Sequence, residues 1–241
     1  MTRLRRTLSW LLVAAGVLLL ADAATTLAWK EPLTALRGAI AQRRLERELE
    51  RLAARTAASG RARAAAVADE RRRVAELALA LDRQVPKGAA IGRISIPRIG
   101  VRAVVVHGSD PEDLRLGPGT IDGSPLPGAG GTAGIAGHRT TYGAQFRDID
   151  QLRPGDAVVA AMPYATLRYA VTDVRVVAPR DVAVLRHSVA DRLVLVACHP
   201  RFSAARRIVV TARLSRVMPG LGTGAPTALR RSSATVKTAR G

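Results

Sequence analysis

Cysteine and aromatic residues are what this sequence has least of: its 241 residues include one cysteine, three tyrosines, two tryptophans and two phenylalanines. A single cysteine excludes an internal disulfide, and no group of cysteines and histidines has the spacing of a zinc site. The shortage of aromatic residues also argues against a surface that stacks on the bases of single-stranded nucleic acid. We therefore expect no cofactor and no metal, and Cys198 can matter chemically only as a free thiol.

Acidic residues are also scarce, with 19 Asp and Glu against 38 Lys and Arg and a formal charge of +19. The basic residues are spread along the chain, whereas a nucleic-acid-binding protein gathers them on one face. Attraction to an anionic cell envelope explains the excess, and we expect no nucleic-acid partner. The acidic residues Asp110, Glu112 and Asp113 are close in sequence, but they are typical of the start of a short helix rather than of a calcium site.

Long hydrophobic runs are absent except at the N-terminus, where Leu8 to Leu27 is almost wholly apolar and follows three arginines. Twenty helical residues rise about 30 Å, the thickness of a bilayer core. Arginines ahead of the span indicate a cytoplasmic N-terminus and an exported remainder. We therefore expect residues 1–30 to be a single-pass signal anchor in the cell membrane. The alternative is a cleaved signal peptide ending near Ala21-Asp22-Ala23, although the run is longer than the usual signal core.

The next segment, residues 31–88, is rich in alanine and arginine, with leucine and isoleucine at near-helical spacing. It predicts a helical stalk that lies against the membrane or the following domain without joining that domain's core. At the other end, residues 215–241 are dominated by Gly, Pro, Ser, Thr and Arg, which predicts a disordered basic tail. The compact domain is then limited to residues 89–214.

Short β-rich runs separated by glycine and proline fill this domain and predict an antiparallel barrel or sandwich. Two brief helical pieces are expected near Pro111 to Leu116 and Ala144 to Leu152. The expected strands are Ile91 to Ile96, Val101 to Val106, Thr132 to Ala136, Ala157 to Met162, Leu167 to Val177, Leu193 to Ala197 and Ile208 to Leu214.

The only cysteine lies at the end of one of these strands. Leu193 to Ala197 leads to Cys198, and Ile208 to Leu214 begins after a short loop, so the two runs predict a hairpin. In this hairpin Cys198 faces Arg207, and a guanidinium reaches across the strand spacing of about 5 Å. The apolar phase places Arg206 inward and Arg207 outward, so Arg206 remains a second candidate for the cation beside the thiol. Without a motif, the residue type alone favours a small buried core residue over a nucleophile at Cys198.

Histidine supplies the expected acid or base. His138 ends an apolar segment and enters a loop rich in glycine and threonine. His199 adjoins Cys198, but adjacent residues of a strand point to opposite sides, so it turns away from the thiol. For His107 and His187 we expect surface or capping roles.

These residues together resemble a known family. Over about residues 91–214 the sequence is similar to sortases, most of all to class E. The similarity lies in the run Ala136-Gly-His138-Arg-Thr-Thr-Tyr142-Gly143, in a strand ending in Cys198-His199-Pro200, and in Arg207-Ile-Val209. The resemblance implies an all-β fold, a closed and roughly eight-stranded barrel with short helices in its loops. It also implies a cysteine transpeptidase with Cys198 as nucleophile, His138 as acid or base, Arg207 as the stabiliser of oxyanion and substrate, and Tyr142 in substrate binding.

By the same resemblance, the enzyme would cut a C-terminal sorting signal, hold the acyl group on Cys198 and pass it to an amine of the cell wall or of a pilin subunit. Val194 and Ala197 stand where the family signature before the cysteine has threonines, and Gln145 stands where class E usually has proline. An alternative is therefore a catalytically silent sortase-like barrel that binds the cell envelope. For Tyr142 the alternative to substrate binding is packing of its loop on the barrel.

Overall fold

The computed structural model describes residues 10, 12–18, 32–63 and 70–219. Its helices are α2 (Pro32–Arg63), α3 (Glu70–Gln84) and α4 (Pro111–Leu116), with 3-10 turns η2 (Pro97–Ile99), η3 (Ile149–Gln151) and η4 (Val182–Leu185). Its strands are β1 (Ala90–Ile96), β2 (Val101–Val106), β3 (Gly119–Thr120), β4 (Thr132–Ala136), β5 (Ala157–Met162), β6 (Ala165–Val177), β7 (Arg192–His199) and β8 (Arg206–Pro219).

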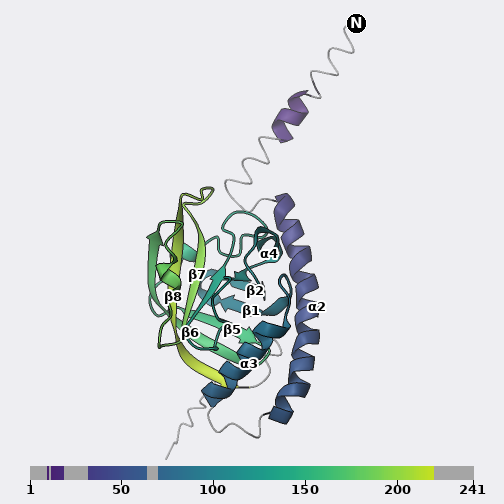
Figure 1. Cartoon of the computed structure of the whole chain (residues 1–241). Helices are drawn as coiled ribbons and strands as arrows, with labels where there is room; N and C mark the ends of the chain where they lie inside the picture. Colours follow the sequence, from purple (N-terminus) through teal and green to yellow (C-terminus); the bar gives the residue numbers. More distant parts are fainter. Residues whose placement is uncertain (1–9, 11, 19–31, 64–69, 220–241) are drawn as a thin grey trace, which may run out of the picture.

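The strands form a closed barrel in the order β1-β2-β3-β4-β7-β8-β6-β5 (Figure 1). This confirms the expected eight-stranded barrel. Most neighbours are antiparallel, but β2 pairs with β3, and β4 with β7, in parallel. Parallel strands point the same way, so β4 and β7 end at the same edge of the barrel.

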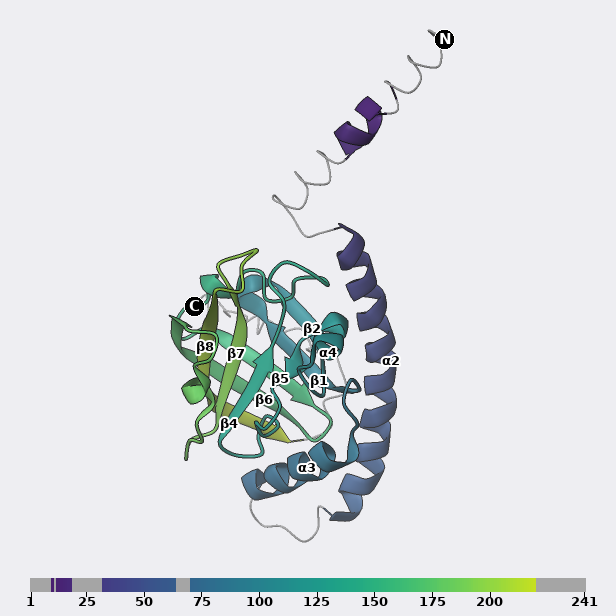
Figure 2. The ribbon, with the colours of Figure 1, turned by 45° about the horizontal axis from the view of Figure 1, so that its top comes forward.

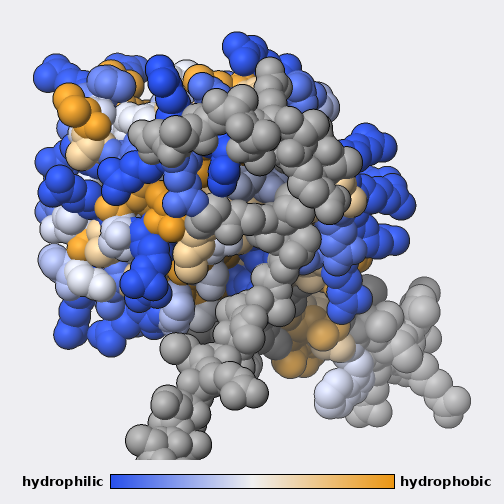
Figure 3. Space-filling view, turned by 90° about the horizontal axis from the view of Figure 1, so that it is seen from below, coloured by the Kyte–Doolittle hydropathy of each residue, from blue (hydrophilic) through white to orange (hydrophobic). Residues whose placement is uncertain are grey.

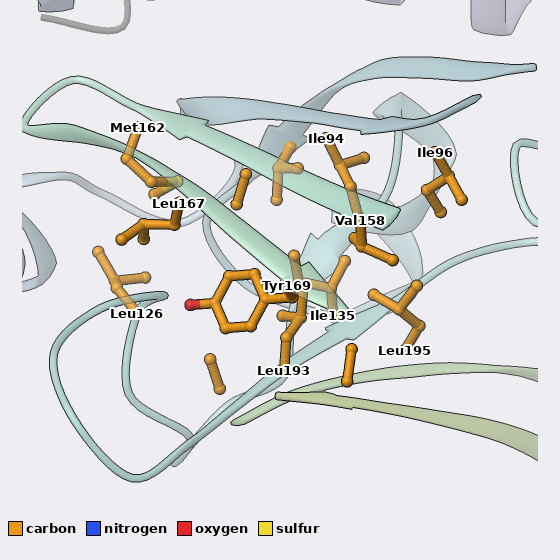
Figure 4. Packing of buried hydrophobic residues seen from close by; sticks show 14 of the residues in the cluster. Ile94, Ile96, Leu126, Ile135, Val158, Met162, Leu167, Tyr169, Leu193 and Leu195 are labelled. Carbon is orange, nitrogen blue, oxygen red and sulfur yellow. The ribbon is translucent and has the colours of Figure 1, made fainter. Parts of the chain in front are cut away.

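Alternating side chains fill the barrel. In β7, Leu193, Leu195 and Ala197 are buried in the main core, whereas Val194 belongs to a cluster on the outer side. Figure 4 shows the Tyr169 ring packed among branched aliphatic side chains such as Ile135 and Leu193. The strand period of two residues therefore separates an apolar interior from an outer wall that is available for chemistry.

The helix α3 belongs to the barrel's own core, which corrects the expectation of a stalk outside it. Its buried residues Val74, Ala78 and Leu81, together with Val85, lie in the same cluster as the barrel interior. Figure 2 shows α3 crossing below the barrel. The spacing of four and three residues between these side chains gives one apolar stripe, and this stripe closes the barrel's lower end.

The helix α2 runs along the side of the barrel (Figures 1 and 2). Its Leu45 and Leu49 are buried in a second, smaller cluster with Ala90, Val104 and Val106 of β1 and β2. Seen from below, the described surface is mostly hydrophilic with apolar patches between the polar side chains (Figure 3). The two helices therefore cover different parts of the barrel.

Two further expectations are wrong. Ser215 to Pro219, expected in the disordered tail, continue β8 and pair with β6. The helix expected over Ala144 to Leu152 is only the 3-10 turn η3, and β3 was not expected because two residues show no period. Most of the expected membrane span, Leu8 to Leu27, and residues 220–241 of the tail lie outside the described residues. Among the residues that are described, no helix is long and apolar enough to cross a membrane.

Candidate active site

The thiol and an arginine face each other at the mouth of the β7–β8 hairpin. Cys198 and Arg207 are direct partners in the antiparallel register, and His199 pairs with Arg206. The predicted hairpin and its register are therefore confirmed. Cys198 is a free cysteine of intermediate burial, so solvent and a ligand can reach this part of the wall.

His138 comes from the neighbouring strand. The parallel register pairs Ala136 with Val196, and the Gly137 amide donates to the Val196 carbonyl at 3.0 Å. His138 and Cys198 each follow two residues later in the same direction, so they leave the barrel side by side at one edge. The spacing of neighbouring strands is about 4.8 Å. The structure thus brings Arg207, Cys198 and His138 together from three adjacent strands.

The backbone at His138 is fixed from below by Phe146. The Phe146 amide donates to the His138 carbonyl at 3.0 Å, and the ring is fully buried. A β-carbon at Gly137 would lie 2.6 Å from the Phe146 ring, closer than real contacts allow. Gly137 is therefore required for the ring to pack beneath the histidine.

The three residues share the outer face of the barrel. Val194 and Val209 are buried under Val184 of η4 on this face, with Val196 beside them, and Cys198 and Arg207 continue the same alternation along β7 and β8. A buried apolar cluster therefore lies next to the thiol on the outer wall, covered by η4.

The surroundings of His138 oppose its charged form. Its ring lies 5.3 Å from the Tyr142 ring, centroid to centroid, and the guanidinium carbon of Arg115 lies 6.0 Å from the Tyr142 ring centroid. Burial, and to a smaller extent the positive charge of Arg115, lowers the pKa of His138 below its ordinary value. The imidazole is therefore harder to protonate than a solvent-exposed one. Tyr142 was expected to bind substrate, and in the structure it packs on the histidine.

Arg207 and Arg206 differ in exposure. Arg206 is exposed, whereas Arg207 is half-buried. Arg207 donates through Nη1 to the carbonyls of Ala204 (2.9 Å) and Arg206 (3.0 Å). These two bonds hold the guanidinium against its own loop, and the backbone register, which pairs Arg207 with Cys198, favours Arg207 over Arg206 as the cation near the thiol.

Arg139, which was not singled out from the sequence, organises the loops beneath the site. It is 3% exposed and donates to the Arg147 carbonyl from Nε and Nη2, both at 3.1 Å. Its Nη1 lies 3.2 Å from Nδ1 of His199, and Nη2 lies 2.8 Å from Asp150. His199 is therefore held by Arg139, as expected for a residue that does not serve the thiol. Only its place directly after His138 distinguishes Arg139 in the sequence.

The other two histidines lie elsewhere. His107 contacts α3, with Nδ1 2.7 Å from the Val85 carbonyl and Nε2 3.2 Å from Asp82. His187 lies against Gly131, where a β-carbon would come within 2.9 Å of its ring. Neither is paired with the thiol. Among the described residues no group of three or more Asp, Glu, His or Cys could hold a metal.

This arrangement offers three functions at one edge of the barrel. A cysteine can attack a carbonyl carbon, a histidine can exchange a proton with a leaving or entering amine, and an arginine can stabilise a developing oxyanion. Together they fit acyl transfer from a peptide bond.

Comparison with protein-family models gives a match to the sortase domain over residues 94–215, about half of the chain. The chain belongs to the sortase family. Sortase D of Bacillus subtilis is 30% identical over 115 residues, which are 47% of this chain and 56% of that protein. The chain thus spans little more than half the length of this relative.

Solved sortase structures have the same fold. A mutant of sortase E from Streptomyces avermitilis is 31% identical with a TM-score of 0.53, and the match covers 60% of this chain and 99% of that one. A sortase D5 transpeptidase from Clostridium perfringens is 29% identical with a TM-score of 0.53, covering 58% and 88%. The family resemblance stated from the sequence is confirmed.

Proposed function

We propose that this sortase is a membrane-anchored cysteine transpeptidase that cleaves a C-terminal sorting signal and transfers the new acyl group to an amine. The observation that carries the proposal is the meeting of Cys198, Arg207 and His138 at one edge of the barrel. Membership of the sortase family supports the same reaction.

The reaction follows from the roles of the three residues. The Cys198 thiolate attacks the carbonyl carbon of the scissile peptide bond, and Arg207 stabilises the oxyanion that forms. The protonated His138 gives its proton to the leaving amine as the C–N bond breaks, which leaves a thioester on Cys198. An incoming amine then attacks this thioester and loses a proton to His138, and the thiolate departs. The active form therefore carries a thiolate and an imidazolium together.

The location and partners are part of the proposal. Three arginines ahead of the apolar run from Leu8 to Leu27 support a single-pass anchor with a cytoplasmic N-terminus and an extracytoplasmic barrel. The substrates are proteins with a C-terminal sorting signal, and the acceptor is an amine of the cell wall or of a pilin subunit. Protease added to intact spheroplasts should digest the barrel domain together with an exported control, and its protection would contradict this topology.

The reaction is tested with the full chain, because α3 contributes to the barrel core. The protein is incubated with sorting-signal peptides and analysed by mass spectrometry for an acyl adduct on Cys198. The adduct should form with wild type, disappear in Cys198→Ala and disappear on addition of an amine acceptor.

A second outcome corresponds to the silent barrel, which the loss of threonines at Val194 and Ala197 favours. In that case Cys198 reacts with iodoacetamide but no peptide of the set forms an adduct. Restoring Val194→Thr and Ala197→Thr together would then show whether these two positions block the reaction.

A further inference from the structure

The loop after His138 has an unfavourable backbone. Tyr142, Gly143 and Ala144 have successive φ angles of 50°, 87° and 45°. Only glycine adopts this left-handed region readily, and residues with side chains remain there only where their surroundings hold them. Something outside the loop must therefore stabilise this conformation.

The same loop forms part of the surroundings of His138. The centroid of the Tyr142 ring lies 5.3 Å from that of the His138 ring and 6.0 Å from the guanidinium carbon of Arg115. A displacement of the loop would therefore change both the burial of the imidazole and its distance from the arginine.

The helix α2 touches the loop through Gly38, which is buried. A β-carbon at position 38 would lie 2.6 Å from the Tyr142 carbonyl oxygen, 2.7 Å from its carbon and 3.1 Å from the Gly143 nitrogen. These neighbours are backbone atoms, so they cannot rotate away. Glycine at this helix position, which costs helix stability, allows α2 to press directly on the loop.

One turn later, Gln42 fixes α2 to the barrel. Its Oε1 accepts from the Val104 amide at 2.6 Å, and its Nε2 donates to the carbonyls of Val104 (3.2 Å) and Leu116 (2.8 Å). Leu116 is the last residue of α4, the short helix that carries Arg115. The helix α2 therefore contacts both the Tyr142 loop and the short helix that carries Arg115.

We propose that α2 is a positioning element of the active site, in which Gly38 and Gln42 hold the Tyr142 loop and Arg115 and so fix the His138 ring at the edge of the barrel that it shares with Cys198. The role of His138 rests on the proposed function, whereas the packing of α2 on the loop does not. Gly38 and Gln42 contact none of the reacting atoms and act through Tyr142 and Arg115.

The test is Gly38→Ala in the full chain. Alanine is the better helix former, so a purely local role for Gly38 predicts an equal or higher Tm and unchanged activity. The positioning role predicts that kcat for acyl transfer falls roughly 10- to 100-fold, as small misplacements of catalytic groups do. The control is Ala39→Val, which adds atoms at the exposed neighbouring position of the same helix. If Gly38→Ala unfolds the chain, Gln42→Met replaces it, with the same loss of kcat expected.

A second measurement separates positioning from folding and from the proposed reaction. The titration of His138 is followed by NMR, with its resonance assigned through His138→Gln. The charged and titratable groups that face His138 are Arg115, Tyr142 and, by register, Cys198. Loosening of the loop should raise the His138 pKa toward its ordinary value in Gly38→Ala and leave it unchanged in Ala39→Val.

The two readouts fail in different ways. An unchanged His138 pKa with wild-type kcat in Gly38→Ala overturns the positioning role. If the wild-type chain transfers no acyl group at all, the proposed function fails, and the titration alone then decides the positioning role.

Discussion

Two arginines flank the candidate catalytic residues, and they differ in almost every respect. Arg139 follows His138, is almost fully buried and is bound on several sides by a carbonyl, a carboxylate and an imidazole. Arg207 faces Cys198 across the hairpin and is half-buried. In the part of the chain that the structure describes, its guanidinium is held only through Nη1, which donates to backbone carbonyls of its own loop. A guanidinium whose three nitrogens are all engaged can stabilise loops, whereas one held through a single nitrogen can also meet a charge that forms during a reaction. Proximity to the site alone therefore does not decide which arginine is free to stabilise a charge in the reaction.

The largest effect is expected for Arg139→Met, which keeps the length of the side chain but removes its charge and its donors. The Arg147 carbonyl and His199 lose their partner, and Asp150 keeps only the more distant Arg201, 3.7 Å away. We expect the free energy of unfolding to fall by about 3 kcal/mol, measured by urea denaturation of the full chain. If Arg139→Met were as stable as wild type, Arg139 would not have the structural role that distinguishes it from Arg207.

The next effect concerns activity. Arg207→Ala should reduce kcat/KM roughly 100-fold, as the loss of an oxyanion donor does, and should leave the unfolding midpoint within error because the lost bonds are exposed. Arg206→Ala is the matched control, since it removes the same charge from the exposed neighbour. Equal losses in both variants would show that only the general positive charge matters.

A smaller loss of stability is expected when only one partner of Arg139 is changed. Asp150→Asn removes the carboxylate at 2.8 Å from Arg139 but keeps an acceptor there, so the free energy of unfolding should fall by only about 1 kcal/mol. Asp173→Asn is the control, because its pairing with Arg175 at 3.7 Å is exposed and should contribute almost nothing. If Asp173→Asn lowered the free energy of unfolding as much as Asp150→Asn does, burial would not explain why the ion pair of Arg139 stabilises the fold.

The smallest effect is expected for Arg115, a third arginine that touches neither the thiol nor the network of Arg139. Its charge lowers the pKa of His138, so Arg115→Gln should raise that pKa toward the ordinary value. The active form needs the thiolate and the imidazolium together, and because a thiol ordinarily has a higher pKa than an imidazole, the acid limb of the pH–rate profile follows the imidazole pKa. This limb should therefore move to higher pH, and more of the enzyme should carry the protonated histidine near neutrality. Arg102→Gln, at an exposed position of β2, should leave the limb in place.

Parts of this architecture could be predicted because they depend on local pattern. The alternation in Leu193 to Ala197 and Ile208 to Leu214 set the hairpin and its register, and so placed Cys198 opposite Arg207. The phase of Ile208, Val210 and Ala212 also identified the outward direction of Arg207.

Other parts depend on contacts between distant segments, which no local pattern contains. The burial of Arg139 follows from loops that meet only in the folded barrel, and Gly38 reads as an unremarkable helix residue until Tyr142 is placed against it. The stripe Val74, Ala78 and Leu81 was diluted by arginine and alanine, so its membership of the core was missed. β3 is too short to have a period at all.

The parallel pairing of β4 with β7 has a consequence for the time at which this protein becomes reactive. Strands of a parallel pair cannot be joined by a tight turn, and here β5, β6 and their connections are made between them. Contacts of such long sequence separation form slowly, after local hairpins. The nascent chain therefore carries its cysteine and histidine apart, and the pair is assembled only when the barrel closes, so a partly folded molecule does not yet have the assembled pair.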